Sequence, residues 1–351
     1  MSLEKLGFSP FFRARWAVVA EELGERVEVA PARVVRVERG GVVIHDGIGE
    51  RAAVRAGSLD GALAVGDFVV AEATEPARIR HILERRGALY RRRASSEVAA
   101  QVIAANVDQV ILVAGLDVGA NVRRLERGLT LAWDAGATPI VVLNKADVDD
   151  DSESVRVEVE GVALGVEVHL VSARAGTGIA TLSAALPPGS TSVFIGPSGV
   201  GKSSLINALF GEERLSTGAV RAGDGKGRHT TTSRQLFALA SGALVIDTPG
   251  TRELGLIAEE SALEHSFADI AALAEHCRFR DCSHAEEPGC AVAAAVEDGR
   301  LSAGRLHSLH KQRRELRFLA ERQAATDHEK RARERGFGRI VKEAQKRKRG
   351  Y

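Results

Sequence analysis

The chain contains 351 residues, of which 44% are hydrophobic and 27% charged, values typical of a soluble globular protein with two or three domains. No apolar run approaches the ~18 residues that cross a bilayer. Residues 1–29 lack the apolar core of a secretory signal, so we expect a cytoplasmic location. The three cysteines lie within fourteen residues, which argues against a disulfide framework.

Charge is distributed unevenly along the chain. The net charge is +1, but residues 303–351 carry 16 Lys/Arg against 6 Asp/Glu, whereas residues 1–302 carry 32 against 41. A basic tail on an acidic body favours a polyanionic partner, and we expect Lys346 to Arg349 to contact nucleic acid. A solvated helix that merely keeps the protein soluble is the alternative.

Residues 26–93 contain short runs rich in β-branched residues, separated by glycine-rich turns. The runs are ARVVRVE, GGVVIHDG, RAAVRAG and GDFVVAEA, and their spacing predicts a small antiparallel barrel. The segment ends in a basic stretch, Arg91 to Arg93 beside Tyr90. We interpret this stretch as an edge that faces nucleic acid, with a charged linker as the alternative.

From Val107 onward, predicted strands alternate with predicted helices. VDQVILVAGL is a continuous apolar run, as expected of a strand buried on both faces of a parallel sheet. Further strands are predicted at TPIVVLN, VEVHLVSA, TSVFIG and ALVIDTPG, with helices over residues 121–135 and from Lys202. This alternation predicts a three-layer α/β domain. After Leu254 the chain is predicted to be helical, interrupted by the cysteine cluster.

A phosphate-binding loop is predicted at GPSGVGKS, residues 196–203. It fits the pattern G-x-x-x-x-G-K-[ST] and lies between an apolar strand, SVFI, and an amphipathic helix, SSLINALF. In this context the loop N–H groups and the positive helix end surround a phosphate. Lys202 would contact the β- and γ-phosphates, and Ser203 would bind Mg²⁺.

NKAD, residues 144–147, follows the strand IVVL and predicts that the nucleotide base is guanine. The Asp147 carboxylate can accept hydrogen bonds from guanine N1–H and the exocyclic amine. Adenine presents an acceptor there, which leaves the carboxylate unpaired at a cost of roughly 1–3 kcal/mol. Asn144 would contact the base and neighbouring loops, and the stem of Lys145 would lie over the ring. A plain surface turn is the alternative.

Asp247, in DTPG after the strand ALVI, matches the acidic residue on the metal side of such sites, and Gly250 would offer its N–H to the γ-phosphate. GRHTTTS supplies Thr231 as the expected second Mg²⁺ ligand, with Thr230 and Thr232 as alternatives. The base-reading motif therefore precedes the phosphate loop, whereas in the common fold it follows. Since domain termini often lie close together, we predict one circularly permuted domain.

The predicted GTP-binding residues come from all of these loops and from VSA at residues 171–173, whose backbone would contact the guanine oxygen. They are Asn144, Lys145, Ala146, Asp147, Ser172, Ala173, Gly196, Pro197, Ser198, Gly199, Val200, Gly201, Lys202, Ser203, Ser204, Thr231, Asp247 and Gly250.

CRFRDCSHAEEPGC has the spacing C-x₄-C-x-H-x₅-C and predicts a structural zinc site. Three thiolates and one imidazole form a closed tetrahedral set, which leaves no open position for catalysis. His276 competes as the nitrogen ligand, but its adjacency to Cys277 strains a shared tetrahedron. Buried thiols beside a chance histidine are the alternative. The expected ligands are Cys277, Cys282, His284 and Cys290.

The order NKAD, SAR, GPSGVGKSS, HTTT, DTPG, with a barrel before it and a Cys/His cluster after it, closely resembles the RsgA family of bacterial circularly permuted GTPases. The resemblance covers nearly the whole chain and implies a late role in assembly of the small ribosomal subunit, with docking on its rRNA. It implies an OB-fold barrel at residues 1–93, a permuted GTPase domain at 94–254 and a zinc-binding helical domain with a basic tail at 255–351. The implied cofactors are Mg²⁺ and one structural Zn²⁺ on the four residues above, and nothing demands more than a monomer.

One familiar catalytic residue is missing from the sequence. Many GTPases carry a glutamine after the DxxG glycine to orient the attacking water, whereas Thr251 stands here. His229 is the nearest candidate for this role, although a histidine in a glycine-rich loop can also be solvated or contact RNA. We expect slow turnover that the small subunit stimulates, coupled to release from it. An RNA-binding scaffold with structural GTP, and a GTPase acting on another RNA or a membrane, are the alternative functions.

Overall fold

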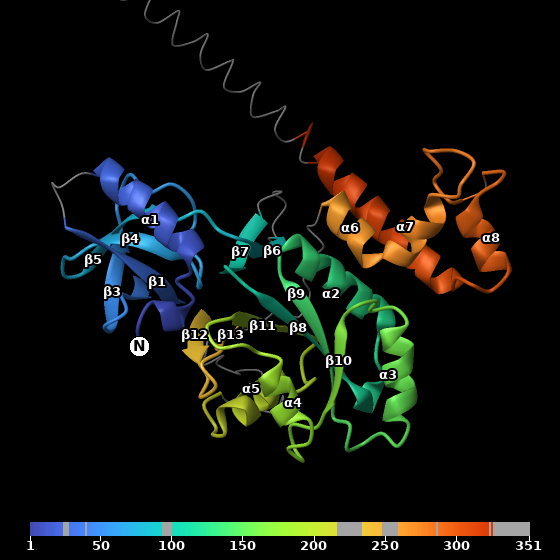
Figure 1. The fold of residues 1–351 in the computed structure, drawn as a ribbon, viewed down its shortest axis with the longest axis horizontal. Coiled ribbons are helices and arrows are strands. Elements are labelled where there is room, and N and C mark those ends of the chain that lie inside the picture. Colours follow the sequence, from blue (N-terminus) through green and yellow to red (C-terminus); the bar gives the residue numbers. More distant parts are fainter. Residues whose placement is uncertain are drawn as a thin grey trace, which may run out of the picture.

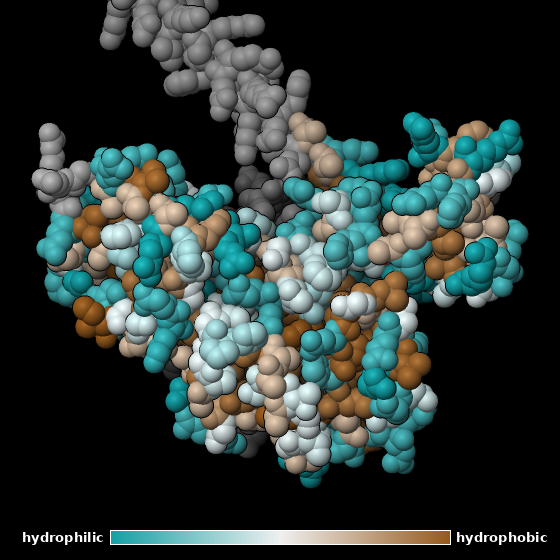
Figure 2. All heavy atoms as spheres, in the orientation of Figure 1, coloured by the Kyte–Doolittle hydropathy of each residue, from teal (hydrophilic) through white to brown (hydrophobic). Residues whose placement is uncertain are grey.

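The computed structural model describes residues 1–23, 28–38, 41–92, 100–215, 234–247, 259–285, 287–322 and 324–325. A barrel near the N-terminus, a central α/β region and a group of C-terminal helices follow one another along the chain and lie side by side (Figure 1). Of the helices within these ranges, none is both long and apolar enough to cross a bilayer. Figure 2 shows hydrophilic residues over most of the visible surface, with hydrophobic residues gathered near the edge of the central region.

Five strands close the N-terminal barrel, as the sequence predicted. β1 pairs with β2 and β4, β2 pairs with β3, and β5 lies between β3 and β4; only the β3–β5 pairing is parallel. The fifth strand, ARIRHI, was missed because its apolar residues alternate with charged ones. The strands are β1 (Val29–Glu38), β2 (Gly41–His45), β3 (Glu50–Arg55), β4 (Phe68–Glu72) and β5 (Ala77–Ile82).

A helix that the sequence analysis did not predict, α1 (Pro10–Leu23), covers part of the barrel. Phe12 is buried and its ring lies 4.3 Å from that of Phe68 on β4, between ring centroids. Phe8 and Leu83 complete this apolar cluster. The helix is weakly amphipathic in sequence, so its packing depends on aromatic side chains rather than on a regular apolar stripe.

The central region has six strands in the order β10-β9-β8-β11-β13-β12, in which β12 alone is antiparallel to its neighbour. Helices lie on both faces, which confirms the predicted α/β alternation (Figure 1). The strands are β8 (Gln109–Gly115), β9 (Thr138–Asn144), β10 (Glu167–Val171), β11 (Thr191–Ile195), β12 (Arg234–Ala238) and β13 (Leu244–Asp247). The helices are α2 (Val122–Asp134), α3 (Ser152–Glu160), α4 (Ile179–Ala184) and α5 (Lys202–Phe210).

The barrel and the central sheet are continuous. β1 pairs antiparallel with β12, with Arg36 opposite Gln235 and Val37 opposite Arg234, so the two form one sheet of eleven strands. Arg33 on β1 is 1% exposed, and its guanidinium donates to Thr191 Oγ1 on β11 at 2.9 Å. Burial lowers the pKa of Arg33 to about 10. This buried charge is tolerated because it is hydrogen-bonded to groups from both regions.

A two-stranded hairpin connects the barrel to β8. It consists of β6 (Ala88–Arg92) and β7 (Ala100–Ala105), so the boundary predicted between residues 93 and 94 falls inside it. After the central sheet come α6 (Glu260–Ser266), α7 (Ala268–Ala274), α8 (Ala291–Glu297) and the helical residues 303–322. α6 packs on α2, which attaches the C-terminal helices to the central region.

Candidate functional site

The two nucleotide motifs, far apart in sequence, meet at the carboxyl ends of parallel strands. Asn144 ends β9, and the phosphate-loop sequence begins directly after β11; β8 lies between the two strands. Asn144 is 2% exposed, and its Nδ2 donates to Val200 O at 2.9 Å. Its Oδ1 accepts from Ala173 N at 3.2 Å. One side chain therefore joins the NKAD loop, the SAR loop and the GPSGVGKS loop.

Close backbone approach explains two glycines of the GPSGVGKS loop. A Cβ on Gly201 would lie 2.3 Å from Asn144 Nδ2, and Gly201 has a φ of +96°. A Cβ on Gly196 would lie 2.5 Å from Val113 O on β8. Any larger residue would separate the loop from its neighbours, so the glycine requirement comes from packing as well as from the turn itself.

The lysine of this loop folds back over it. α5 begins at Lys202, and the Nζ atom donates to Gly196 O and Pro197 O, both at 2.8 Å. Ser203 and Ser204 follow in the first turn of α5, and Ser198 and Gly199 complete the loop. The ammonium group of Lys202 and the start of α5 therefore both lie at this loop, where they would hold an anion.

The carboxylate of Asp147 is held by a serine from the next loop. Ser172 Oγ donates to Asp147 Oδ1 at 2.5 Å and accepts from Ala175 N at 3.0 Å. The hydrogen bond from Ser172 holds the pKa of Asp147 below its usual value. The carboxylate is therefore ionised at neutral pH. Ala146 N donates to Val171 O at 3.2 Å, which further ties the two loops.

Asp247 ends β13, which pairs in parallel with β11. Burial raises the pKa of the Asp247 carboxyl, and the charge of Lys202 partly offsets this rise. The charge of Lys202 therefore acts on the carboxyl of Asp247, the residue predicted to lie on the metal side. Several predicted residues lie outside the described ranges, namely His229, Thr230, Thr231, Thr232, Gly250, Thr251, Arg93 and Lys346 to Arg349.

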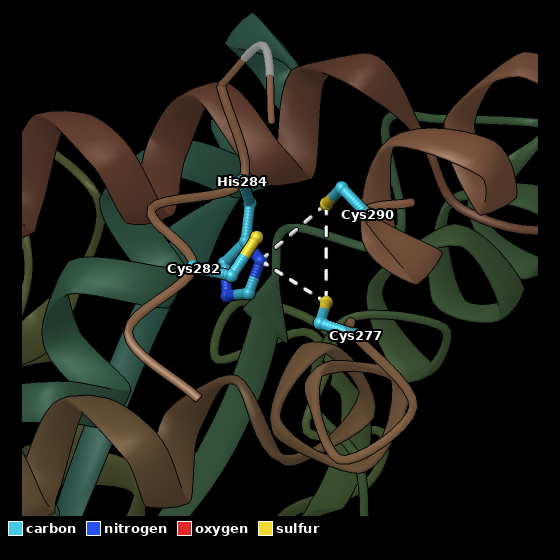
Figure 3. A group of neighbouring side chains, drawn as sticks. All are labelled: Cys277, Cys282, His284 and Cys290. Carbon is cyan, nitrogen blue, oxygen red and sulfur yellow. Dashed lines mark hydrogen bonds between the residues drawn. The ribbon is translucent and has the colours of Figure 1, made fainter. Parts of the chain in front are cut away.

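The cysteines and one histidine converge between α7 and α8 (Figure 3). The ligand atoms of Cys277, Cys282, His284 and Cys290 all lie within 4.8 Å of one another. His284 Nδ1 lies 3.7 Å from Cys277 Sγ and 3.6 Å from Cys290 Sγ, and the two sulfurs are 3.9 Å apart. Tetrahedral zinc requires edges of about 3.8 Å between sulfurs and about 3.6 Å between sulfur and nitrogen. The group fits that ion, and among the described residues it includes His284 rather than His276.

Local backbone contacts shape this cluster. His284 adopts a φ of +61°, which turns its ring toward the sulfurs. Glu287 accepts from Ser283 N at 2.8 Å and Ala285 N at 3.0 Å, and these bonds with the Ser283 hydroxyl lower the pKa of Glu287 to about 2. Cys290 caps α8 by accepting from Ala293 N. The sequence analysis did not assign Glu287 a role.

Comparison with known proteins decides the family. A model described as RsgA GTPase matches residues 82–257. The chain is 42% identical over 328 residues to Small ribosomal subunit biogenesis GTPase RsgA 2 of Listeria monocytogenes serotype 4b (strain F2365), covering 92% of this chain and 91% of that one. The chain belongs to the RsgA GTPase family. This member is therefore a GTP hydrolase.

Three further comparisons extend the likeness along most of the chain. Small ribosomal subunit biogenesis GTPase RsgA of Streptomyces coelicolor (strain ATCC BAA-471 / A3(2) / M145) is 44% identical, covering 91% of this chain and 90% of its own. The crystal structure of YjeQ from Thermotoga maritima matches with a TM-score of 0.62 at 29% identity, over 82% of this chain and 99% of that one. The structure of YloQ, described as a circularly permuted GTPase, gives 0.61 at 26%, over 84% and 97%.

The sheet order explains how this RsgA-family chain is permuted. The strand before the phosphate loop, β11, lies in the interior of the six-stranded central region, although three of those six strands precede it in the chain. The base-reading strand β9 is two positions away across β8. Cutting and rejoining the chain changes the order of the strands in sequence but leaves their places in the sheet unchanged. The circularly permuted GTPase fold is thus confirmed.

The sequence analysis did not identify one acidic residue that lies near the RsgA-family nucleotide motifs. Asp117 follows β8 and forms an ion pair with Lys145 of NKAD, with Oδ2 and Nζ 2.6 Å apart. A signal was present, because an acidic residue directly after a buried parallel strand lies at the edge where α/β proteins bind ligands.

Proposed function

We propose that this chain is a Mg²⁺-dependent GTPase of ribosome assembly, which binds the small ribosomal subunit and hydrolyses GTP to GDP and phosphate late in its maturation. The relatives named above carry small ribosomal subunit biogenesis in their names. The subunit would stimulate hydrolysis, and hydrolysis would be coupled to release. A cytoplasmic location and a monomeric state accompany this proposal.

The observation that carries the nucleotide part of the proposal is the position of Asn144. Its side chain bonds both Val200 O and Ala173 N, so the loop for the base and the loop for the phosphates form one unit. In this proposal Asp147 accepts hydrogen bonds from guanine N1–H and the exocyclic amine. The ionised state of Asp147, which Ser172 favours, suits an acceptor that receives two donors.

The remaining contacts are proposed for the phosphate side. Lys202 would exchange its bonds to Gly196 O and Pro197 O for bonds to the β- and γ-phosphates. The N–H groups of the loop and of the first turn of α5 would surround the phosphates. The GTP-binding residues from the sequence analysis are retained in full as part of this proposal, including Thr231 and Gly250 outside the described ranges.

Residues near the phosphate loop also suit a magnesium ion. Ser203 offers a hydroxyl beside Lys202, and Asp247 offers a buried carboxyl at the end of the neighbouring strand. Oxygen donors of this kind are the ligands that Mg²⁺ prefers. We assign Ser203 and Thr231 as direct ligands and Asp247 to the metal side. The ion would neutralise charge on the phosphates when bound.

The proposal also assigns a residue that orients the attacking water. Thr251 stands where many GTPases have a glutamine, and we retain His229 as the residue that orients the attacking water. Because His229 lies between α5 and β12 in the sequence, docking on the ribosomal subunit could bring it to the γ-phosphate. Stimulation by the subunit follows from this arrangement.

The flanking regions would supply the contacts with rRNA. The closed barrel has the strand order of an OB fold, a common nucleic-acid-binding architecture, and we assign it to residues 1–93. The permuted GTPase domain would span residues 94–254 and the zinc-binding domain with its basic tail 255–351. One Zn²⁺ on Cys277, Cys282, His284 and Cys290 would hold the last of these domains in shape. Arg91 to Arg93 and Lys346 to Arg349 are the proposed phosphate contacts.

The test is GTP hydrolysis by the purified protein, alone and with small or large ribosomal subunits. We expect strong stimulation by the small subunit only, and loss of activity in Lys202→Ala. A rate indifferent to ribosomal subunits would refute the ribosomal part of the proposal. Retention of full activity by Lys202→Ala would refute the assignment of the phosphate loop.

A further inference from the structure

Asp117 reaches the NKAD motif from a different strand. It lies in the short 3₁₀ turn Leu116–Val118 that follows β8, and its Oδ2 is 2.6 Å from Lys145 Nζ. The two side chains are 35% and 30% exposed, so the pair is neither fully solvated nor fully buried. Lys145 itself has a φ of +66°, an unusual backbone conformation for a lysine.

Sheet register places the two residues together. β8 and β9 are parallel, with Gly115 opposite Asn144. Lys145 directly follows Asn144 and Asp117 is the second residue after Gly115, so both lie at the same edge of the sheet. A Cβ on Gly115 would lie 2.6 Å from Asp117 Oδ1 and 3.2 Å from Val200 Cγ2. The glycine therefore leaves room for the carboxylate to turn back toward the phosphate loop. The buried side chain of Leu116 anchors this turn.

We propose that Asp117 is a positioning residue of the nucleotide site, which holds the Lys145 side chain over the plane of the guanine ring. The inference rests on the proposed function, in which the stem of Lys145 covers the base. A lysine side chain has several rotatable bonds, and fixing it before the nucleotide arrives removes an entropic cost from binding. Asp117 acts only through Lys145, and it does not read the base.

The proposed roles of Asp117 and Asp147 predict different effects on the preference of the protein for guanine over hypoxanthine. Hypoxanthine has the ring and N1–H of guanine but lacks the exocyclic amine. Loss of Asp117 should weaken GDP and IDP binding by the same factor, because the covering stem contacts the ring that both share. Loss of Asp147 should weaken GDP binding more than IDP binding, because the amine loses its acceptor. The ratio of the two affinities therefore distinguishes positioning from base reading.

The experiment measures the affinities of Asp117→Asn for GDP and IDP by calorimetry. Partly exposed ion pairs contribute modestly, so we expect Kd to rise about two- to fivefold for both nucleotides. At saturating GTP, kcat should be unchanged while KM rises. Asp150→Asn is the matched control, since it removes the same charge from an exposed position in the loop after NKAD and should leave both affinities unchanged.

A double-mutant cycle tests the route through Lys145. Lys145→Met keeps an unbranched stem but removes the ammonium group, so adding Asp117→Asn to it should have no further effect. Additive effects of the two substitutions, or unchanged affinity in Asp117→Asn, would overturn the inference about Asp117. In either case, GDP binding by the unaltered protein would still support the proposed nucleotide site. Failure of the unaltered protein to bind GDP would instead overturn the proposed function. Melting temperatures of all variants establish that each is folded.

Discussion

Arg305 donates a 2.9 Å hydrogen bond from Nη1 to Glu126 Oε1, although the two side chains are only 4% and 2% exposed. Arg305 lies in the helical residues 303–322 and Glu126 in α2, so the bond joins the C-terminal helices to the central region. The same guanidinium donates to Asp269 on α7 at 2.6 and 2.8 Å and to Ser266 O at 3.0 Å. A buried charge with this many partners holds one arrangement of four helices, namely α2, α6, α7 and residues 303–322.

Replacing Arg305 should be strongly destabilising. Arg305→Ala leaves Glu126 buried without its partner, and breaking a buried pair in this way typically costs about 3–5 kcal/mol in free energy of unfolding. Urea unfolding of the variant measures the loss. Arg300→Ala is the control, because Arg300 pairs with Asp298 at the surface, where an ion pair contributes little to stability. Equal losses in the two variants would contradict the distinction between buried and exposed pairs.

Asn144 should matter for nucleotide binding through the loops that it joins. Asn144→Ala removes its bonds to Val200 O and Ala173 N and leaves buried groups unpaired, so we expect GDP affinity to fall roughly 10- to 100-fold. Fluorescence titration with a labelled GDP measures the change. Asn121→Ala is matched in chemistry but removes only the N-cap of α2, so it should lower stability by about 1 kcal/mol and leave affinity intact. If both variants bind GDP equally well, Asn144 does not couple the loops.

The pH dependence of GDP binding should reveal the bond from Ser172 to Asp147. This bond lowers the pKa of Asp147, so the carboxylate persists as pH falls and is protonated only below its ordinary range. In Ser172→Ala the pKa should rise, and the loss of GDP binding on acidification should begin at a higher pH. Titrations from neutral pH down to about pH 3, a range that passes below the ordinary pKa of an aspartate, measure the shift, with Ser190→Ala as a control hydroxyl away from the motif. Superimposable pH profiles for the unaltered protein and Ser172→Ala would contradict this role.

Separate substitution of His284 and His276 tests which histidine belongs to the metal cluster. Elemental analysis should find one zinc per chain, and His284→Ala should lose it, because Nδ1 of His284 faces two of the sulfurs. His276→Ala should retain the metal, since His276 lies outside the group. Removal of zinc with a chelator should lower the melting temperature, because binding free energy is also folding free energy. The reverse pattern in the two variants would assign the nitrogen ligand to His276.

Local patterns in the sequence predicted most of the elements and the family. Continuous apolar runs identified the parallel strands, because a strand covered on both faces excludes polar residues; on β8, Val110 and Leu112 face one core cluster and Ile111 and Val113 the other. Spacing alone identified the four Cys/His residues that converge in the structure, because all of them lie within one short segment of the chain. The phosphate loop was equally local, because its glycines and lysine act within a single turn.

Long-range contacts were decided only in the tertiary structure. Pairing of β1 with β12, the ion pair of Asp117 with Lys145, and the bond of Arg305 to Glu126 each join segments whose separation in sequence carries no periodic signal. α1 was missed for a related reason, because its apolar residues pack against the barrel without forming a regular repeat. Sequence thus determined which chemical groups this GTPase carries, and packing determined which of them touch, because contact depends on the register and order of strands that pair across the whole chain.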